Sequence, residues 1–250
     1  MSNLYLPLII PFLFFSAKDA MLSGNISGND LSGTSVQQTV EREMPIKVFR
    51  TDSVSDIPLF VYITGDGGWN KFSSALCNYI NQKGIPVVAL DAQKYFWESK
   101  SPEKAAVDLT CVIEKYLKEW KKERFVVAGF SFGADIVPFL LNRFPAEIQT
   151  RAVSSILISP DKTCDFEIHL TDMLSMGISK GKYNVPIEIQ KSVIKNFTVV
   201  FGSDESENAK HSFQLAGVKM KILQGNHHFD SEYAVVADLI LKEIADSTIR

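Results

Sequence analysis

The stretch from Phe125 to Phe139 constrains the fold of this chain more than any other. It begins with a continuous apolar run, which is typical of a buried parallel strand, and later shows helical spacing at Ile136 and Leu140. Between the two, Gly129 to Gly133 spell Gly-Phe-Ser-Phe-Gly, the Gly-x-Ser-x-Gly pattern of a tight turn from strand to helix. Because such a turn strains its serine and exposes the hydroxyl above the sheet edge, the pattern predicts a nucleophile at Ser131.

Two features predict backbone amides that could stabilise an oxyanion. Phe132 would open the helix after the turn, where N–H groups lack a partner within the helix and point at the reacting centre. The glycine-rich residues 65–69 follow another apolar run, at the place where hydrolases with this serine turn carry a second oxyanion amide. We expect Asp66 or Gly67 to supply it, although an ordinary glycine turn would have the same composition.

Apolar runs alternate with helical patterns along the chain. This predicts a mostly parallel sheet with helices on both faces and a site at the carboxyl ends of the strands. Residues 162–195 lack strand alternation and resemble a cap or lid. The predicted fold class is therefore α/β, an α/β-hydrolase fold with a small cap insertion. The expected strands are 45–50, 57–64, 85–90, the run from Phe125, 153–158, 196–201 and 218–223; the expected main helices are 71–83, 102–122 and 230–245.

An unassisted serine hydroxyl is a poor nucleophile, so it needs a base and an acid that orients the base. The order serine, acid, histidine, each just after a strand, is that of the α/β-hydrolase triad. Asp204, two residues after a glycine that ends a strand, is the preferred acid. Glu205 and Glu207 stay open as alternatives, and so does Asp161, which follows the preceding strand.

The candidate base lies in Gly-Asn-His-His-Phe, residues 225–229. His228 is preferred over His227 because it directly precedes an apolar residue and lies three residues after the glycine. His227 would then bond to the loop.

Four residues are candidates for substrate binding. Tyr95 and Trp97 belong to Lys-Tyr-Phe-Trp after a strand, where three aromatic residues would either wall a pocket or close the top of the core. Trp69 ends the glycine-rich loop. Asp135 lies one turn into the helix after Ser131, where a carboxylate favours the helix N-terminus and could also meet a cationic substrate group.

Composition excludes several other classes. A chain of 250 residues with 46% hydrophobic residues and a net charge of −3 is long enough for one globular domain and gives no electrostatic reason to bind nucleic acid. Only three cysteines occur, Cys77, Cys111 and Cys164, and none has metal-ligand spacing with histidine or another cysteine. We therefore expect no disulfide framework, no metal and no cofactor.

The N-terminus suggests export. Leu4 to Phe15 form an apolar run that is shorter than the ~20 residues of a membrane-spanning helix but suits a secretory signal, and small residues follow at Ser16, Ala17 and Ala20. An uncleaved anchor is the alternative. We expect a signal peptide over 1–20, a disordered Ser/Gly/Asn-rich tether over 21–39 and the hydrolase domain over 40–250.

Several motifs together resemble the bacterial virulence protein VirJ and the related AcvB family. The resemblance covers about residues 45–245 and implies an exported, periplasmic α/β-hydrolase. It also implies a link to type IV secretion and virulence and, from AcvB-like members, hydrolysis of lysyl-phosphatidylglycerol. The motifs are Gly65 to Trp69, Lys94 to Trp97, Gly129 to Asp135, Asp165 to His169 and Gly225 to Phe229.

The leading hypothesis from sequence is a periplasmic serine hydrolase that cleaves an ester, such as an aminoacyl ester on a phosphatidylglycerol headgroup at the membrane surface. Its expected partners are a small-molecule or lipid-headgroup substrate and, beyond the substrate, the periplasmic membrane surface or type IV secretion components, with no nucleic acid. A non-catalytic binding or chaperone protein that supports type IV secretion is the alternative from a different class, since fold alone cannot exclude it. A general esterase is the third.

Overall fold

The computed structural model describes residues 44–51, 56–168 and 181–248. The predicted signal peptide (1–20), the predicted tether (21–39) and the predicted domain boundary at residue 40 all lie outside these residues. So does part of the predicted cap, from His169 to Lys180.

A seven-stranded sheet in the order β1-β3-β2-β4-β5-β8-β9 forms the centre of the molecule. Every neighbouring pair is parallel except β1 and β3. The inner strands β2, β3, β4 and β8 are buried along their whole length, which explains their continuous apolar sequences. The strands are β1 (Ile46–Phe49), β2 (Leu59–Ile63), β3 (Val87–Leu90), β4 (Phe125–Phe130), β5 (Ala152–Ile158), β8 (Phe197–Gly202) and β9 (Val218–Leu223).

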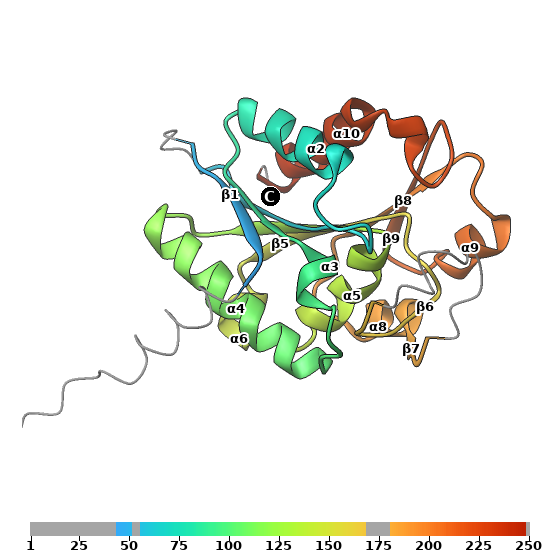
Figure 1. Cartoon of the computed structure of the whole chain (residues 1–250), viewed down its shortest axis with the longest axis horizontal. Helices are drawn as coiled ribbons and strands as arrows, with labels where there is room; N and C mark the ends of the chain where they lie inside the picture. The colour runs from blue at the N-terminus through green and yellow to red at the C-terminus, as the bar shows by residue number, and fades with distance from the viewer. Residues whose placement is uncertain (1–43, 52–55, 169–180, 249–250) are drawn as a thin grey trace, which may run out of the picture.

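Helices cover both faces of this sheet (Figure 1). On one face α2 (Lys71–Gln82) lies against α10 (Tyr233–Thr248). On the other, α5 (Phe132–Leu141) packs between α4 (Pro102–Glu119) and α8 (Val185–Lys191). The three-layer α/β-hydrolase architecture predicted from the sequence is thus confirmed.

The main helices begin where local chemistry satisfies their first amides. Asn70 accepts a hydrogen bond from the N–H of Ser73 at the start of α2. Ser101 caps α4 through the N–H of Lys104, and Pro102 occupies the first turn, where its missing N–H costs no hydrogen bond.

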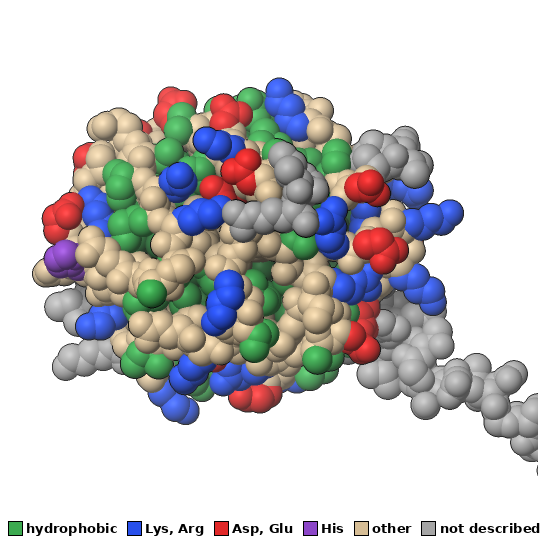
Figure 2. Space-filling model, turned by 180° about the vertical axis from the view of Figure 1, so that it is seen from behind, with side chains coloured by type: hydrophobic (Ala, Val, Ile, Leu, Met, Phe, Trp, Pro, Cys, Tyr) green, Lys and Arg blue, Asp and Glu red, His purple; other side chains and the backbone are tan. Residues whose placement is uncertain are grey.

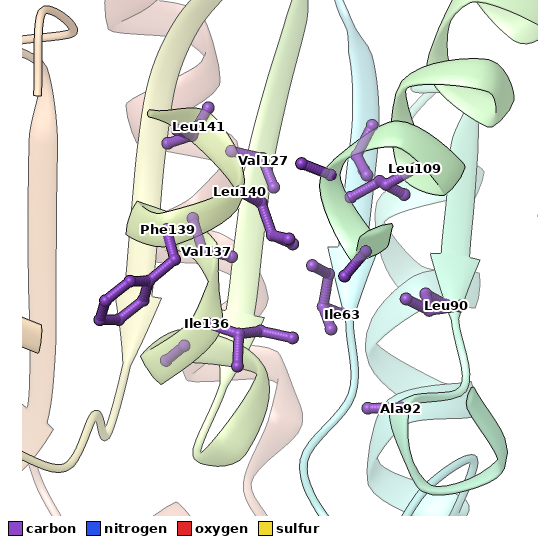
Figure 3. Packing of buried hydrophobic residues seen from close by; sticks show 14 of the residues in the cluster. Ile63, Leu90, Ala92, Leu109, Val127, Ile136, Val137, Phe139, Leu140 and Leu141 are labelled. Carbon is purple, nitrogen blue, oxygen red and sulfur yellow. The ribbon is translucent and has the colours of Figure 1, made fainter. Parts of the chain in front are cut away.

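The helix that follows the serine turn is packed into the larger part of the core. Ile136 and Leu140 of α5 approach Val127 of β4 and Ile63 of β2 (Figure 3). Most residues of α5 after Phe132 are buried, so the helix cannot shift without disturbing the sheet. The core thereby holds the first turn of α5 in place at the carboxyl edge of the strands.

Some elements were not expected. The loop with three aromatic residues contains a short helix, α3 (Ala92–Tyr95), capped by Asp91. Two further short helices are α6 (Ala146–Gln149) and α9 (Glu207–Ser212), and η1 (Phe229–Ser231) is a single 3₁₀ turn. In the predicted cap, the described residues form the two-stranded β6 (Thr163–Cys164) and β7 (Tyr183–Asn184), followed by α8.

The surface carries both signs of charge. On the face opposite to that of Figure 1, lysine and arginine side chains are interspersed with aspartate and glutamate (Figure 2). Among residues 44–51, 56–168 and 181–248, no helix combines the length and the apolar character needed to cross a membrane.

Candidate active site

Ser131 is held in the strained geometry that the Gly-x-Ser-x-Gly pattern predicts. Its φ is 51° and its ψ is −122°, a conformation that non-glycine residues rarely adopt. A Cβ on Gly129 would lie 2.2 Å from the carbonyl oxygen of Gly133, and a Cβ on Gly133 would lie 2.3 Å from that of Ile63. Only glycine fits at both positions, so strand, turn and helix can cross closely enough to raise the serine above the sheet.

The sheet ladder continues into the site. The Ser131 N–H donates to the Ile158 oxygen at 2.8 Å, and the Ser159 N–H donates to the Val200 oxygen at 2.7 Å. At the next step the Ser203 N–H donates to the Leu223 oxygen at 2.7 Å. The loops that follow β4, β5, β8 and β9 therefore start from one fixed edge.

The structure places His227, and not His228, against the serine. His227 Nε2 lies 3.0 Å from Ser131 Oγ. The preference for His228 was wrong: its side chain is exposed, and its ring lies edge-on to that of His227 and tilted against that of Phe130. The reason is local, because the rings of the two adjacent histidines lie at 87° to each other, and it is the ring of His227 that meets Ser131 Oγ.

The acid that contacts this histidine is Glu205. Its Oε2 lies 3.0 Å from His227 Nδ1, and its side chain is 10% exposed. The preference for Asp204 as the acid was wrong: its side chain is exposed and accepts a hydrogen bond from Ser203 Oγ. The Asp204 N–H donates to the Gly225 oxygen, which ties this loop to the histidine loop, and it is the next side chain, that of Glu205, that reaches His227.

The other two acidic alternatives do not contact the histidine. Glu207 is exposed at the start of α9 and pairs with Lys210. Asp161 is exposed in the loop after β5, and its charge acts on His227 from outside hydrogen-bonding distance.

Hydrogen bonds and burial have opposite effects on the pKa values of His227 and Glu205. Burial favours the neutral form of Glu205, but bonds from His227, the Gly202 N–H and Ser159 Oγ outweigh it and lower its pKa. Burial likewise disfavours the charged form of His227, yet the bond to Glu205 and its negative charge raise the pKa of His227 above its usual value. For His228, burial and the neighbouring His227 lower the pKa.

The predicted oxyanion residues lie around Ser131. Phe132 is the first residue of α5, so its N–H has no partner within the helix. A Cβ on Gly65 would lie 3.3 Å from the Cβ of Ser131, which places the glycine-rich loop beside the nucleophile. Of the two predicted donors, the Gly67 N–H is already engaged, because it donates to Asp66 Oδ1 at 2.9 Å.

The aromatic candidates divide between core and surface. Tyr95 is buried, and its hydroxyl donates to Asp108 Oδ2 at 2.6 Å. Trp69 is half-buried, and its ring packs on Phe49 of β1 with 5.9 Å between centroids. Trp97 is 52% exposed. Tyr95 therefore closes the top of the core, and of these three only Trp97 presents most of its side chain to solvent.

Asp135 is buried in the first turn of α5. Its Oδ1 accepts a hydrogen bond of 2.6 Å from the N–H of Asp161. Burial raises its pKa well above the usual value, and the negative charges of Asp161 and Asp66 add to this. Three carboxyl groups besides Glu205 thus influence one another close to the serine.

In the part of the chain that the structure describes, no three His, Cys, Asp or Glu residues are grouped so that they could hold a metal ion. The cysteines are free, with Cys77 and Cys164 buried. At the site, the side chains of Ser131, His227 and Glu205 form a chain connected by two hydrogen bonds. Ser159, whose hydroxyl lies 2.8 Å from Glu205 Oε1, was not predicted from the sequence as a residue of the site.

Solved structures with the same architecture include several hydrolases. Est1E from Butyrivibrio proteoclasticus superposes with a TM-score of 0.54 at 15% identity, over 80% of this chain and 94% of that one. MenH from S. aureus superposes with a TM-score of 0.58 at 11% identity, over 81% of this chain and 98% of that one. An esterase from Pyrobaculum calidifontis superposes with a TM-score of 0.55 at 16% identity, over 87% of this chain and 91% of that one. At these identities the likeness establishes the fold.

Comparison of sequences identifies the family. No curated protein matches the chain significantly. The model of the family described as bacterial virulence protein (VirJ), however, matches residues 57–248, which include the glycine-rich loop, the serine turn and the histidine loop. The chain therefore belongs to the VirJ family of bacterial virulence proteins, on an α/β-hydrolase fold.

Proposed function

We propose that this protein is a serine hydrolase that cleaves carboxylic esters, with Ser131 as nucleophile, His227 as base and Glu205 as acid. The observation that carries the proposal is the continuous hydrogen-bonded chain from Ser131 Oγ through both nitrogens of His227 to Glu205, at 3.0 Å for each contact. These distances lie within the range in which a base can take a proton from a hydroxyl.

Each residue has a distinct step. His227 Nε2 takes the hydroxyl proton as Ser131 Oγ attacks the ester carbonyl, and then gives that proton to the departing alkoxide, which leaves an acyl-serine. A water molecule, deprotonated by the same nitrogen, then attacks the acyl carbonyl. The bond from that carbonyl to Ser131 Oγ breaks, His227 returns the proton to Oγ, and the acyl group leaves as a carboxylic acid. Glu205 keeps the other proton on Nδ1 and stabilises the imidazolium formed in each half-reaction.

Backbone amides supply the remaining stabilisation. Phe132 N–H at the start of α5 and Asp66 N–H in the loop beside Ser131 are the donors for the oxyanion. The strained backbone at Ser131 supports this assignment, because such strain persists where the surroundings impose a functional geometry.

The substrate we propose is an aminoacyl ester on a phosphatidylglycerol headgroup. Negative charge around the site supports a cationic acyl group, since Asp66 and Asp161 both act electrostatically on His227. Membership of the VirJ family and the apolar run at Leu4 to Phe15 support placing the reaction in the periplasm, at the membrane surface.

Release of free lysine from vesicles that contain lysyl-phosphatidylglycerol tests the proposal. The wild type should release lysine, and Ser131→Ala should not. Asp161→Asn should raise KM for the lysyl ester and leave KM for a neutral nitrophenyl ester unchanged, with Asp204→Asn as the matched control. Equal release by wild type and Ser131→Ala would contradict hydrolysis at this serine. A folded wild type inert toward both esters would favour the binding-protein alternative.

A further inference from the structure

Ser159 occupies the position beside Ser131 at the end of the next strand. In the register of β4 and β5, Phe130 pairs with Ile158, so the residues after them, Ser131 and Ser159, are neighbours at the sheet edge. The N–H of Ser159 is bonded to β8, the strand that leads to Glu205. Ser159 thus lies between the loop of the nucleophile and the loop of the acid.

The backbone of Ser159 is strained and its side chain is buried. Its φ is 51°, the same value as at Ser131, and it is 1% exposed. A non-glycine residue keeps such a conformation only where its surroundings impose it, and such residues cluster at functional sites. The strained backbone of Ser159 therefore indicates a functional role for its hydroxyl.

The hydroxyl has two acceptors within reach. Glu205 Oε1 lies 2.8 Å from Ser159 Oγ, and the carbonyl oxygen of His227 lies 3.3 Å away. A hydroxyl has one proton, and the shorter contact with the ionised acceptor is the stronger. Ser159 therefore donates to Glu205.

A glutamate needs such a partner more than an aspartate would, because its longer side chain has one more rotatable bond. The Gly202 N–H and the Ser159 hydroxyl both bind Oε1, at 2.6 and 2.8 Å, which leaves Oε2 facing His227 Nδ1. We propose that Ser159 is a positioning residue that fixes the rotation of the Glu205 carboxylate, so that the base of the proposed hydrolase stays correctly oriented. This inference rests on the function proposed above.

The pKa of His227 measures the orientation of Glu205 directly. In the full-length protein, NMR titration of the imidazole resonance, assigned with His227→Ala, should show a pKa about one unit lower in Ser159→Ala than in wild type. The misplaced carboxylate would no longer oppose the effect of burial. The other charged groups that act on His227 are Asp161, Asp66 and His228, and this substitution changes none of them.

Two more variants separate the hydroxyl from packing and strain. Ser159→Gly also removes the hydroxyl but tolerates positive φ, so it should give the same pKa shift as Ser159→Ala. Ser155→Ala is the matched control: Ser155 is a fully buried β5 serine whose hydroxyl has no hydrogen-bond partner among the described residues. It should leave the pKa of His227 unchanged.

Hydrolysis of a nitrophenyl ester provides the second readout. Both Ser159 variants should lower kcat/KM about tenfold, as expected for a lost bond to a charged group, and move its acid limb to lower pH. An unchanged or higher pKa of His227 in both variants would overturn the proposal, because the Gly202 N–H alone would then hold Glu205. If the wild type cleaves no ester, the proposed function fails, while the NMR titration still decides the role of Ser159.

Discussion

Replacement of Glu205 by glutamine tests the hydrogen-bonded chain with minimal change in shape. An amide has one oxygen and one NH₂ group, so it cannot reproduce all three contacts of the carboxylate. If its oxygen keeps the bonds from the Gly202 N–H and Ser159, its NH₂ faces His227 Nδ1. The imidazole must then carry its proton on Nε2, and it cannot accept the proton of Ser131.

The opposite amide orientation restores the correct tautomer of the imidazole but turns the NH₂ group toward the Gly202 N–H. In the wild type this N–H lies only 2.6 Å from Glu205 Oε1. Two donors that face each other cost about 2 kcal/mol, so only about one molecule in 30 adopts this orientation. Loss of the negative charge beside the imidazolium costs a further factor of about 30. Together the two effects predict a decrease of about 10³ in kcat/KM.

The assay is hydrolysis of a nitrophenyl ester by the purified protein, with folding checked by circular dichroism. Asp204→Asn is the matched control: its exposed side chain is bonded to Ser203, and its activity should stay within about twofold of wild type. Full activity in Glu205→Gln combined with a large loss in Asp204→Asn would refute the reasoning.

Three further predictions follow from other contacts. Gly133→Ala should lower the free energy of unfolding by about 1 to 3 kcal/mol in urea titrations, because its Cβ would meet the carbonyl oxygens of Ile63, the last residue of β2, and Thr64. Gly67→Ala, whose Cβ meets only an atom 3.6 Å away, is the control, and equal midpoints would contradict this prediction. Tyr95→Phe should lower the free energy of unfolding by about 1 to 3 kcal/mol, because it removes one of the two side-chain donors, Tyr95 and Lys104, of the buried Asp108 carboxylate. Tyr79→Phe, at an exposed bond, should lower it by under about 0.5 kcal/mol, and similar losses in both variants would contradict the difference in burial. Because the base must be neutral and the pKa of His227 is raised, kcat/KM should fall as pH decreases through a value above 6.5; an inflection below 6.5 would contradict this sign.

The fold could be predicted from sequence because its signals are local and repeated. The continuous apolar strands reflect burial on both faces, and Gly129 and Gly133 are required by backbone atoms 2.2 and 2.3 Å from their missing Cβ positions. The parallel sheet then brings the ends of β4, β8 and β9 to one edge, where a serine, an acid and a histidine that each follow one of these strands can meet.

The choice between adjacent residues could not be predicted in the same way. Asp204 and Glu205, like His227 and His228, differ by one position in loops whose side-chain directions depend on backbone turns. Contacts between the loops decide which side chain points inward: a Cβ on Gly202 would lie 2.4 Å from the Gly225 and Asn226 oxygens. Such an approach between distant segments leaves no periodic signal in the sequence.

Labelling with a serine-reactive phosphonate, followed by intact-protein mass spectrometry, tests the proposed chain of Ser131, His227 and Glu205 most directly. We expect one adduct on the wild type and on His228→Ala, none on Ser131→Ala, and a strongly reduced labelling rate in His227→Ala. Because the two histidines are adjacent, each substitution serves as the control for the other. A wild-type labelling rate in His227→Ala, or no labelling of the folded wild type, would contradict the account.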